Sequence, residues 1–163
     1  MPNFKRKLNR ISKYDYSQIG YYFITICTYE KKHFFGSINS EKMDMSKYGV
    51  IAEIKLKQAS KVYDCISLID YVIMPNHIHF ILAIEENKIV NISRIVKGYK
   101  EAVTKDVGFK IWQKSFYDHV IRNEADYLRI RQYIDENILK WNLDEYNENG
   151  PQCGPLRRIN KEM

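Results

Sequence analysis

The sequence predicts an α+β fold in which helices pack on one face of an antiparallel sheet. The run from Tyr21 to Tyr29 is rich in β-branched and aromatic residues, which is typical of a buried strand. The apolar runs Ile66–Met74 and His77–Ile84 are separated only by Pro75 and Asn76, residue types that favour a tight turn, so they predict a hairpin. Helical patterns lie between these strands along the chain, and that mixture indicates the α+β class.

Three segments carry apolar residues at the three- or four-residue spacing of an amphipathic helix. The first runs from Ser46, a suitable N-cap, to about Lys61. The second covers residues 91–107 and has a basic side opposite its apolar one. The third runs from about Glu124 to Trp141. Ahead of all three, residues 31–39 predict a turn into a short strand.

Length and composition predict one compact domain. The chain has 163 residues, of which 45% are hydrophobic, enough to bury a real core. We expect this domain to span residues 1–147 with a basic N-terminal segment. The stretch "ENGPQCGP" breaks regular structure, so residues 148–163 are expected to form a flexible tail.

The charge distribution favours a polyanionic partner. The net charge is +6, and the N-terminal segment carries several cations before its first acid. The candidate DNA-binding residues in this segment and in the second predicted helix are Lys5, Arg6, Lys7, Arg10, Lys97 and Lys100. Arg157, Arg158 and Lys161 make the C-terminal end basic as well, and solvated basic tails are the alternative interpretation of both ends.

The cysteines and the apolar runs exclude several classes. The 3 cysteines are widely spaced and form no CxxC pair, which argues against a disulfide scaffold and a thiolate zinc site. The N-terminus lacks the apolar segment of a secretory signal, and no apolar run approaches the length of a membrane span. We therefore expect a cytoplasmic protein without a membrane partner.

Two histidines occupy alternate positions in the second strand of the predicted hairpin. Side chains alternate between faces along a strand, so His77, His79 and Ile81 share one face, while Ile78 and Phe80 share the other. Residues two apart on a strand are separated by roughly 6.6 Å, close enough for both rings to reach one cation. A third ligand and open positions would make such a site catalytic. A chance pair on a strand surface remains the alternative.

The third predicted helix offers further chemistry. Tyr133 and Asn137 stand four residues apart, which places them on one helix face. A tyrosine can attack phosphate and form a phosphotyrosine ester, although its ordinary pKa near 10 requires help from a metal or a base. An amide oxygen suits a hard cation such as Mg²⁺ or Mn²⁺. Because the chain has 13 tyrosines, spacing alone does not single out Tyr133 from a packing role.

The motif "MPNHIHFIL" resembles the His-hydrophobe-His signature of the REP-associated tyrosine transposases, bacterial relatives of single-strand insertion-sequence transposases within the HUH superfamily. The resemblance covers about Asn9 to Asp144. It includes "YDYSQIGYYFITICTYEKKHFFG", "IVKGYKEAVTK" and "IWQKSFYDHVIRNEADYLRIRQYIDENILKW". Several separated motifs in one order are more specific than the histidine pair alone.

The resemblance implies a ferredoxin-like antiparallel sheet of the HUH transposase type and a divalent-metal-dependent strand transferase acting on single-stranded or hairpin DNA. By position, His77 and His79 match the metal-binding pair, and Tyr133 matches the nucleophile that forms a 5′-phosphotyrosine. Asn137 is close to where relatives place a third metal ligand. The chain departs from the family motif at Ile138, where proline is usual, and this change lets the helix continue toward Trp141. Relatives act as monomers or homodimers.

Other function classes remain open at this point. A domesticated descendant could keep the fold and bind DNA without turnover. A nucleotide hydrolase of the histidine-triad type would need a further histidine at position 81, where the chain has Ile81. A strand-based metalloenzyme of the cupin kind fits poorly, because the chain contains too much helical pattern.

Overall fold

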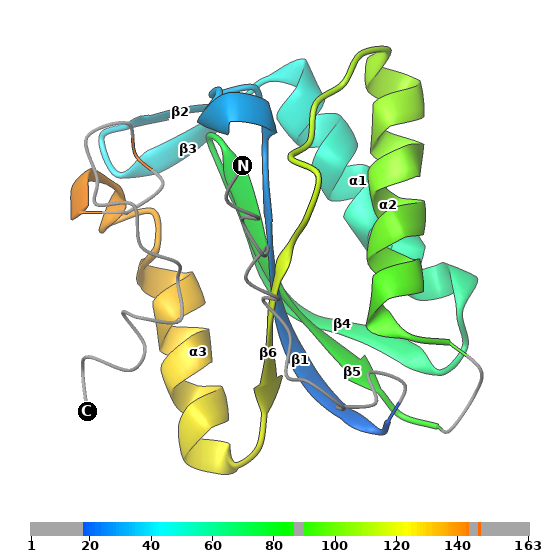
Figure 1. Ribbon diagram of the computed structural model, residues 1–163. Coiled ribbons are helices and arrows are strands. Elements are labelled where there is room, and N and C mark those ends of the chain that lie inside the picture. Colours follow the sequence, from blue (N-terminus) through cyan, green and yellow to red (C-terminus); the bar gives the residue numbers. More distant parts are fainter. Residues whose placement is uncertain (1–17, 87–89, 144–146, 148–163) are drawn as a thin grey trace, which may run out of the picture.

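Four strands form the central sheet of the computed structural model, which describes residues 18–86, 90–143 and 147 (Figure 1). They are β1 (Gly20–Cys27), β4 (Ile66–Met74), β5 (His77–Ile84) and β6 (Tyr117–Ile121), in the order β4-β5-β1-β6. All neighbouring pairs are antiparallel. The predicted hairpin is confirmed: β4 and β5 are joined at Pro75-Asn76, and Met74 pairs with His77.

Helices α1 (Lys47–Val62) and α2 (Ile92–Val107) lie together on one face of the sheet (Figure 1). Ser46 and Asn91 cap them, each accepting a hydrogen bond from a backbone N–H of the first turn. Together with β1, β4, β5 and β6 they give the chain order β-α-β-β-α-β of a ferredoxin-like fold.

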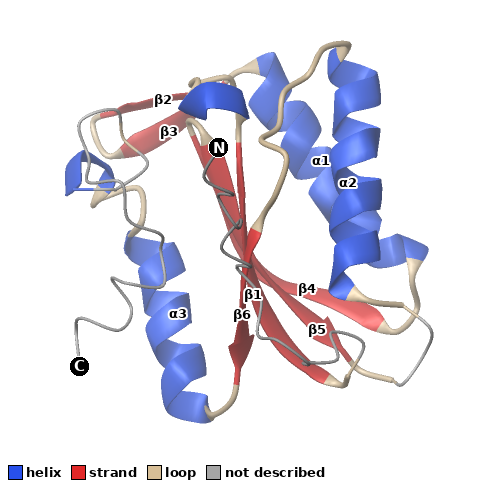
Figure 2. Cartoon of the chain, viewed as in Figure 1, coloured by secondary structure: helices blue, strands red, loops and turns tan. Residues whose placement is uncertain are grey.

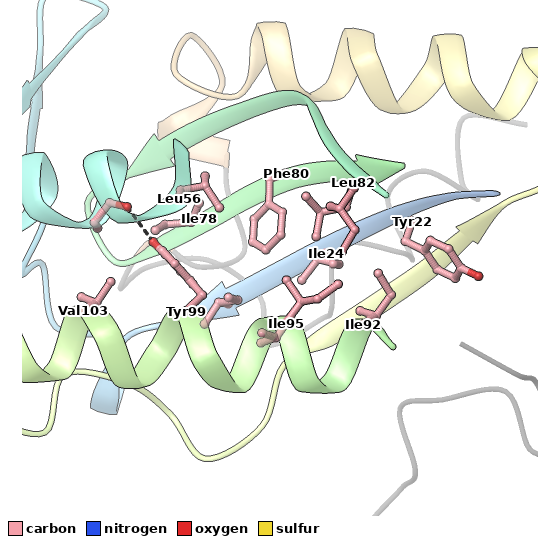
Figure 3. Close-up of a cluster of buried hydrophobic side chains, with 14 of the residues drawn as sticks. Tyr22, Ile24, Leu56, Ile78, Phe80, Leu82, Ile92, Ile95, Tyr99 and Val103 are labelled. Carbon is pink, nitrogen blue, oxygen red and sulfur yellow. Dashed lines mark hydrogen bonds between the residues drawn. The ribbon is translucent and has the colours of Figure 1, made fainter. Parts of the chain in front are cut away.

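The main apolar core lies between these two helices and the sheet (Figure 3). Strand side chains that point toward the helices alternate along β1 and β5, as the period of two requires. The Tyr99 hydroxyl donates to the Ala52 carbonyl at 2.9 Å, which links the two helices inside the core (Figure 3). The residues that meet there include Tyr22, Ile24, Ile78, Phe80, Leu82, Ile95, Tyr99 and Val103.

Helix α3 (Glu124–Glu136) lies on the opposite face of the sheet (Figure 2). The predicted α+β class and antiparallel sheet are confirmed, but the expectation that all helices share one face fails for α3. Ile130 and Ile134 bury a second, smaller cluster against Phe23 and Ile81. Because both faces of the central strands are covered, β5 is buried at every position.

The end of α3 also differs from the expectation. Helix α3 stops at Glu136, and a tighter turn follows, in which the Trp141 N–H donates to the Ile138 carbonyl at 3.3 Å. The short helix η2 (Trp141–Leu143) completes this turn and buries Trp141 against the second cluster. The absence of proline at position 138 therefore does not extend the helix to Trp141.

A two-stranded ribbon and a short turn stand beside the sheet. The ribbon pairs β2 (Gly36–Asn39) with β3 (Lys42–Met45), and η1 (Tyr29–Lys31) follows β1. Gly36 has φ +139°, and a Cβ there would lie 2.0 Å from the Asp44 carbonyl oxygen of β3. Only glycine therefore fits at this position of the ribbon. Within residues 18–86 and 90–143, no helix combines the length and the apolar character that a membrane crossing requires.

Candidate active site

The β4–β5 turn is fixed by hydrogen bonds before the histidine strand begins. The Asn76 carbonyl accepts from the Thr28 backbone N–H at 2.9 Å and from its hydroxyl at 3.0 Å. The Asn76 side chain in turn donates to the Lys31 carbonyl at 3.1 Å. These bonds attach the turn to the end of β1, and so they determine where His77 enters the sheet.

The structure places His77 and His79 on one face of β5, as the alternation predicts. In register they oppose Cys27 and Thr25 of β1. Ile81, on the same face, packs in the second cluster beneath α3. Both histidines are 0% exposed, so neither is a surface residue of the strand. The pair therefore does not lie on a solvated strand face.

Each histidine is oriented through its Nδ1 atom. His77 Nδ1 lies 2.8 Å from Asn76 Oδ1, and because an amide oxygen only accepts, a hydrogen bond between them requires the His77 proton on Nδ1. His79 Nδ1 lies 2.7 Å from Thr25 Oγ1. The ring centroids of the two histidines are 4.6 Å apart. Metal-binding histidines are commonly held in this way, with one nitrogen fixed by a protein partner and the other directed at the metal.

Burial keeps both imidazoles neutral. It lowers the pKa of His79 from 6.5 to about 3. Burial also lowers the pKa of His77 well below 6.5, and the nearby His79 lowers it further. The neutral ring is the form that binds a metal ion, because a protonated imidazole has no lone pair to donate.

Tyr133 reaches the histidine pair from α3, within the same chain. Its hydroxyl lies 3.3 Å from His79 Nε2. Phe23 packs against both side chains, with ring centroids 5.3 Å from His79 and 6.1 Å from Tyr133. The tyrosine is half-buried, so the phenol stands at the boundary between the histidines and solvent.

Asn137 follows directly after α3 and is 3% exposed. Its side-chain amide donates to the Tyr133 carbonyl at 3.4 Å. Burial lowers the pKa of His77, and Asn137 opposes this effect by a smaller amount. The structure therefore brings His77, His79, Tyr133 and Asn137 together, although they come from two parts of the sequence.

The donor set can be compared with the needs of a cation. Among the described residues, no group of three or more His, Cys, Asp or Glu is arranged to hold a metal. The cluster instead offers two neutral imidazoles with an amide and a phenol beside them. Such a set fits a divalent cation that completes its coordination with substrate oxygens or water.

Two aromatic residues near the pair had no signal as site residues in the sequence. The Trp141 ring lies 6.1 Å from His77 and 5.6 Å from His33, measured between centroids. The positive charge of Lys31 and the neighbouring His33 both lower the pKa of His77, so this side of the site favours anions. His33 stands in "KKHFF" without any spacing that could have related it to His77.

The predicted DNA-binding lysines of α2 do not meet this site. Lys97 is exposed and lies 3.8 Å from Glu101. Lys100 donates to the Gln113 carbonyl at 2.6 Å and the Ser115 carbonyl at 3.3 Å, and partial burial lowers its pKa. Both belong to the helix layer on the face opposite the histidines. The other predicted residues, Lys5, Arg6, Lys7 and Arg10, lie outside the described residues.

Comparison with known proteins found similarity both in sequence and in structure. No family model matches the chain. A protein of Haemophilus influenzae, described as uncharacterized, is 29% identical over 165 residues, which cover 86% of this chain and 92% of that protein. A REP-associated tyrosine transposase bound to a REP hairpin has a TM-score of 0.65 and 22% identity, over 81% of this chain and 74% of that one. This chain shares its fold.

A second structure supports the same conclusion. A candidate transposase from Deinococcus radiodurans has a TM-score of 0.51 and 16% identity, over 78% of this chain and 95% of that one. The fold implied by the histidine and tyrosine motifs is thus the fold that the chain has, with α3 carrying the candidate nucleophile.

Proposed function

We propose that this chain is a transposase-type enzyme that cleaves and rejoins single-stranded, hairpin-forming DNA through Tyr133. The observation that carries the proposal is the 3.3 Å separation of the Tyr133 hydroxyl and His79 Nε2 within one chain. A tyrosine held against one histidine of a neutral, oriented pair is consistent with the arrangement that the motif resemblance implies. The shared fold of a transposase bound to a REP hairpin and the net charge of +6 support a DNA substrate.

His77 and His79 would hold the divalent cation, Mg²⁺ or Mn²⁺, with Asn137 as a candidate third ligand. The cation supplies charge neutralisation for the phosphate when it is bound. The chain's own contribution is preorganisation: Asn76 and Thr25 fix the two rings, and burial keeps them neutral.

Tyr133 would attack the scissile phosphate in line. The bond from its phenolic oxygen to phosphorus forms, and the bond from phosphorus to the 3′ oxygen breaks. The phenolic proton passes to solvent, and the products are a 5′-phosphotyrosine and a free 3′-hydroxyl, which takes up a proton from solvent. A 3′-hydroxyl can then attack the phosphotyrosine and rejoin the strand. Lys31 and His33 would favour the phosphate near His77.

The test is covalent capture of a labelled hairpin oligonucleotide in the presence of Mn²⁺. The parent protein should give an adduct that survives denaturing electrophoresis. Tyr133→Phe removes one oxygen and keeps the ring, so DNA affinity should stay within about two-fold while the adduct is lost, because the ring contacts to Phe23 remain.

Two tyrosines are matched controls for this substitution. Tyr117 of β6 pairs with Thr25 and so lies on the same sheet face, and Tyr127 belongs to the same helix. Tyr117→Phe and Tyr127→Phe should keep the adduct. Loss of the adduct in one of these variants, with its retention in Tyr133→Phe, would show a different nucleophile. Hairpin binding without an adduct from the parent in Mg²⁺ or Mn²⁺ would favour the non-catalytic DNA-binding module instead.

A further inference from the structure

A pocket of about 370 Å³ opens where β6 turns into α3. This volume is at the small end of the range for ligand pockets, so it suits one flat group rather than a large molecule. The buried side chain of Ile121 contributes an apolar surface, and the other lining residues carry aromatic or polar groups. The lining consists of Tyr21, Ile121, Arg122, Asn123, Glu124 and Tyr127.

Two tyrosine rings give the pocket its aromatic walls. Tyr21 is 44% exposed, although it stands in a strand whose other residues are mostly buried. Its ring meets that of Tyr127 edge to face, with centroids 5.6 Å apart. The Arg131 guanidinium lies 5.9 Å from the Tyr127 centroid and is itself held by Asp70 at 3.2 Å. The contact with Arg131 restricts the Tyr127 ring, which lowers the entropy cost of stacking a ligand on it.

The polar residues of the rim suit a nucleotide. Asn123 is committed to capping α3, because its side chain accepts from the Asp126 backbone N–H at 2.8 Å. Arg122 and Glu124 are exposed beside it. Arg122 can donate to a phosphate or to a base carbonyl, and Glu124 can accept from a base N–H.

The pocket lies on the same sheet face as the candidate active site. Tyr21, Phe23 and Thr25 occupy alternate positions of β1 and therefore point to one side. Phe23 stacks on His79, and Thr25 hydrogen-bonds to it. Four residues of strand separate Tyr21 from Thr25, or roughly 13 Å, and six residues of helix separate Tyr127 from Tyr133, or roughly 9 Å.

We propose that this pocket binds an unpaired nucleobase of the DNA strand on which Tyr133 acts, stacked against Tyr21 and Tyr127. The proposal rests on the proposed function, because it takes the ligand to be single-stranded DNA. Stacking on aromatic side chains is the usual way in which proteins hold unpaired bases, and Arg122 provides the charge that a nucleotide requires. The pocket would hold the DNA strand at a short distance from the phosphate that Tyr133 attacks.

The test compares a short thymidine homopolymer with an abasic strand of the same length, both bound in a chelator so that no cleavage occurs. The parent should bind the thymidine strand at least about five-fold more tightly. Tyr21→Leu should bind the two strands more nearly alike, because its exposed ring can be removed without opening the core. Tyr29→Leu is the matched control, since Tyr29 is 37% exposed beyond the other end of β1 and should keep the parent's preference.

Arg122→Gln provides a second variant, which should weaken binding of both strands and leave the preference for bases unchanged. Equal binding of the two strands by the parent, or an equal loss of preference in Tyr21→Leu and Tyr29→Leu, would overturn the pocket assignment. The covalent-capture test distinguishes the two proposals. If the parent forms an adduct but binds the thymidine and abasic strands equally, only the pocket assignment is refuted. If the parent prefers the thymidine strand but forms no adduct, only the catalytic function is refuted.

Discussion

Thr25 orients the His79 ring, although its position in an apolar strand does not indicate this role. The residue is 1% exposed, and its hydroxyl oxygen lies 2.7 Å from His79 Nδ1. Thr25 thereby fixes the ring of His79, and Asn76 fixes the ring of His77 through its own contact with Nδ1. Sequence alone indicated the two imidazoles, because alternate histidines in an apolar strand are unusual. It could not indicate their partners, since Thr25 is distant in sequence and threonine is common in strands.

Thr25→Val should weaken metal binding. Valine has nearly the shape of threonine but cannot hydrogen-bond, so His79 would lose the partner that fixes its ring. Loss of such a supporting contact typically costs about 10- to 100-fold in metal affinity. Mn²⁺ titration by calorimetry measures the change. Thr104→Val, on α2 and away from the histidines, is the control and should keep the parent's affinity; equal affinity in the two variants would contradict the assigned role of Thr25.

The buried histidines should also make stability depend on pH. Their folded-state pKa values lie below 6.5, the His79 value at about 3, so the unfolded chain binds more protons in this range. The stabilisation is complete above pH 6.5 and is lost as the pH falls from 6.5 toward about 3. Urea unfolding in a chelator should show a loss of up to about 1.4 kcal/mol per pH unit for each histidine.

The control for this dependence is His77→Gln, which removes one of the two titrating histidines. It should reduce the slope of the free energy of unfolding against pH. A free energy of unfolding that is constant below pH 6.5 in the parent would show that the rings are not held neutral by burial.

Among the elements, those with a local signal were predicted and those that depend on tertiary contacts were not. The β4–β5 hairpin, the Ser46 cap of α1 and the extent of α2 agree with the sequence patterns. Strands β3 and β6 were not anticipated, because short edge strands have little hydrophobic periodicity. The ribbon turn needs positive φ at Ser40 and Glu41, and neither residue type signals it.

The sequence does not predict that α3 covers the second face of the sheet, and the reason is physical. The face of β5 that it covers carries His77 and His79, and two polar residues conceal the apolar character of that face. Its end at Glu136 was missed because Ile138 and Trp141 continue an apolar spacing that the structure uses in a tighter turn. For the same reasons, the contact of Tyr133 with His79 could only be inferred from the family resemblance and not from spacing.

Asp126 attaches α3 to the edge strand β6. It is 6% exposed and accepts from His119 at 2.8 Å and from Arg129 at 3.2 Å. Asp126→Ala should lower the free energy of unfolding by about 1–3 kcal/mol, because it leaves both donors without their acceptor. It should also slow adduct formation, since α3 positions Tyr133, while DNA affinity changes little.

Thermal unfolding and single-turnover capture measure these two effects. Glu136→Ala is the matched control on the same helix, because its partner Lys140 is exposed and ion pairs at the surface contribute little to stability. An Asp126→Ala protein that unfolds and reacts like the Glu136→Ala protein would refute the anchoring role.

For the whole molecule, the net charge of +6 predicts strongly salt-dependent DNA binding. Replacing Lys5, Arg6 and Lys7 by alanine removes 3 cationic side chains. If all contact backbone phosphates of a single strand, the slope of log affinity against log salt should become shallower by about 2. Fluorescence anisotropy across a salt series measures this slope.

The control replaces Lys47, Lys57 and Lys61 of α1, which changes the net charge equally on the helix layer remote from the histidines. The same change of slope in both proteins would mean that only net charge matters and that the N-terminal segment is no specific contact.

The position of Trp141 beside His77 allows tryptophan fluorescence to report on the histidine site. The chain has only 2 tryptophans, and the sheet separates them. Trp112 packs against Phe35 and Tyr99 in the core of α1 and α2, whereas Trp141 stands beside His77. Emission from Trp141 will therefore respond to any cation or phosphate that arrives at the histidines, while Trp112 supplies a constant background. A Trp112→Phe protein would follow the filling of the site in real time without a dye or a labelled strand.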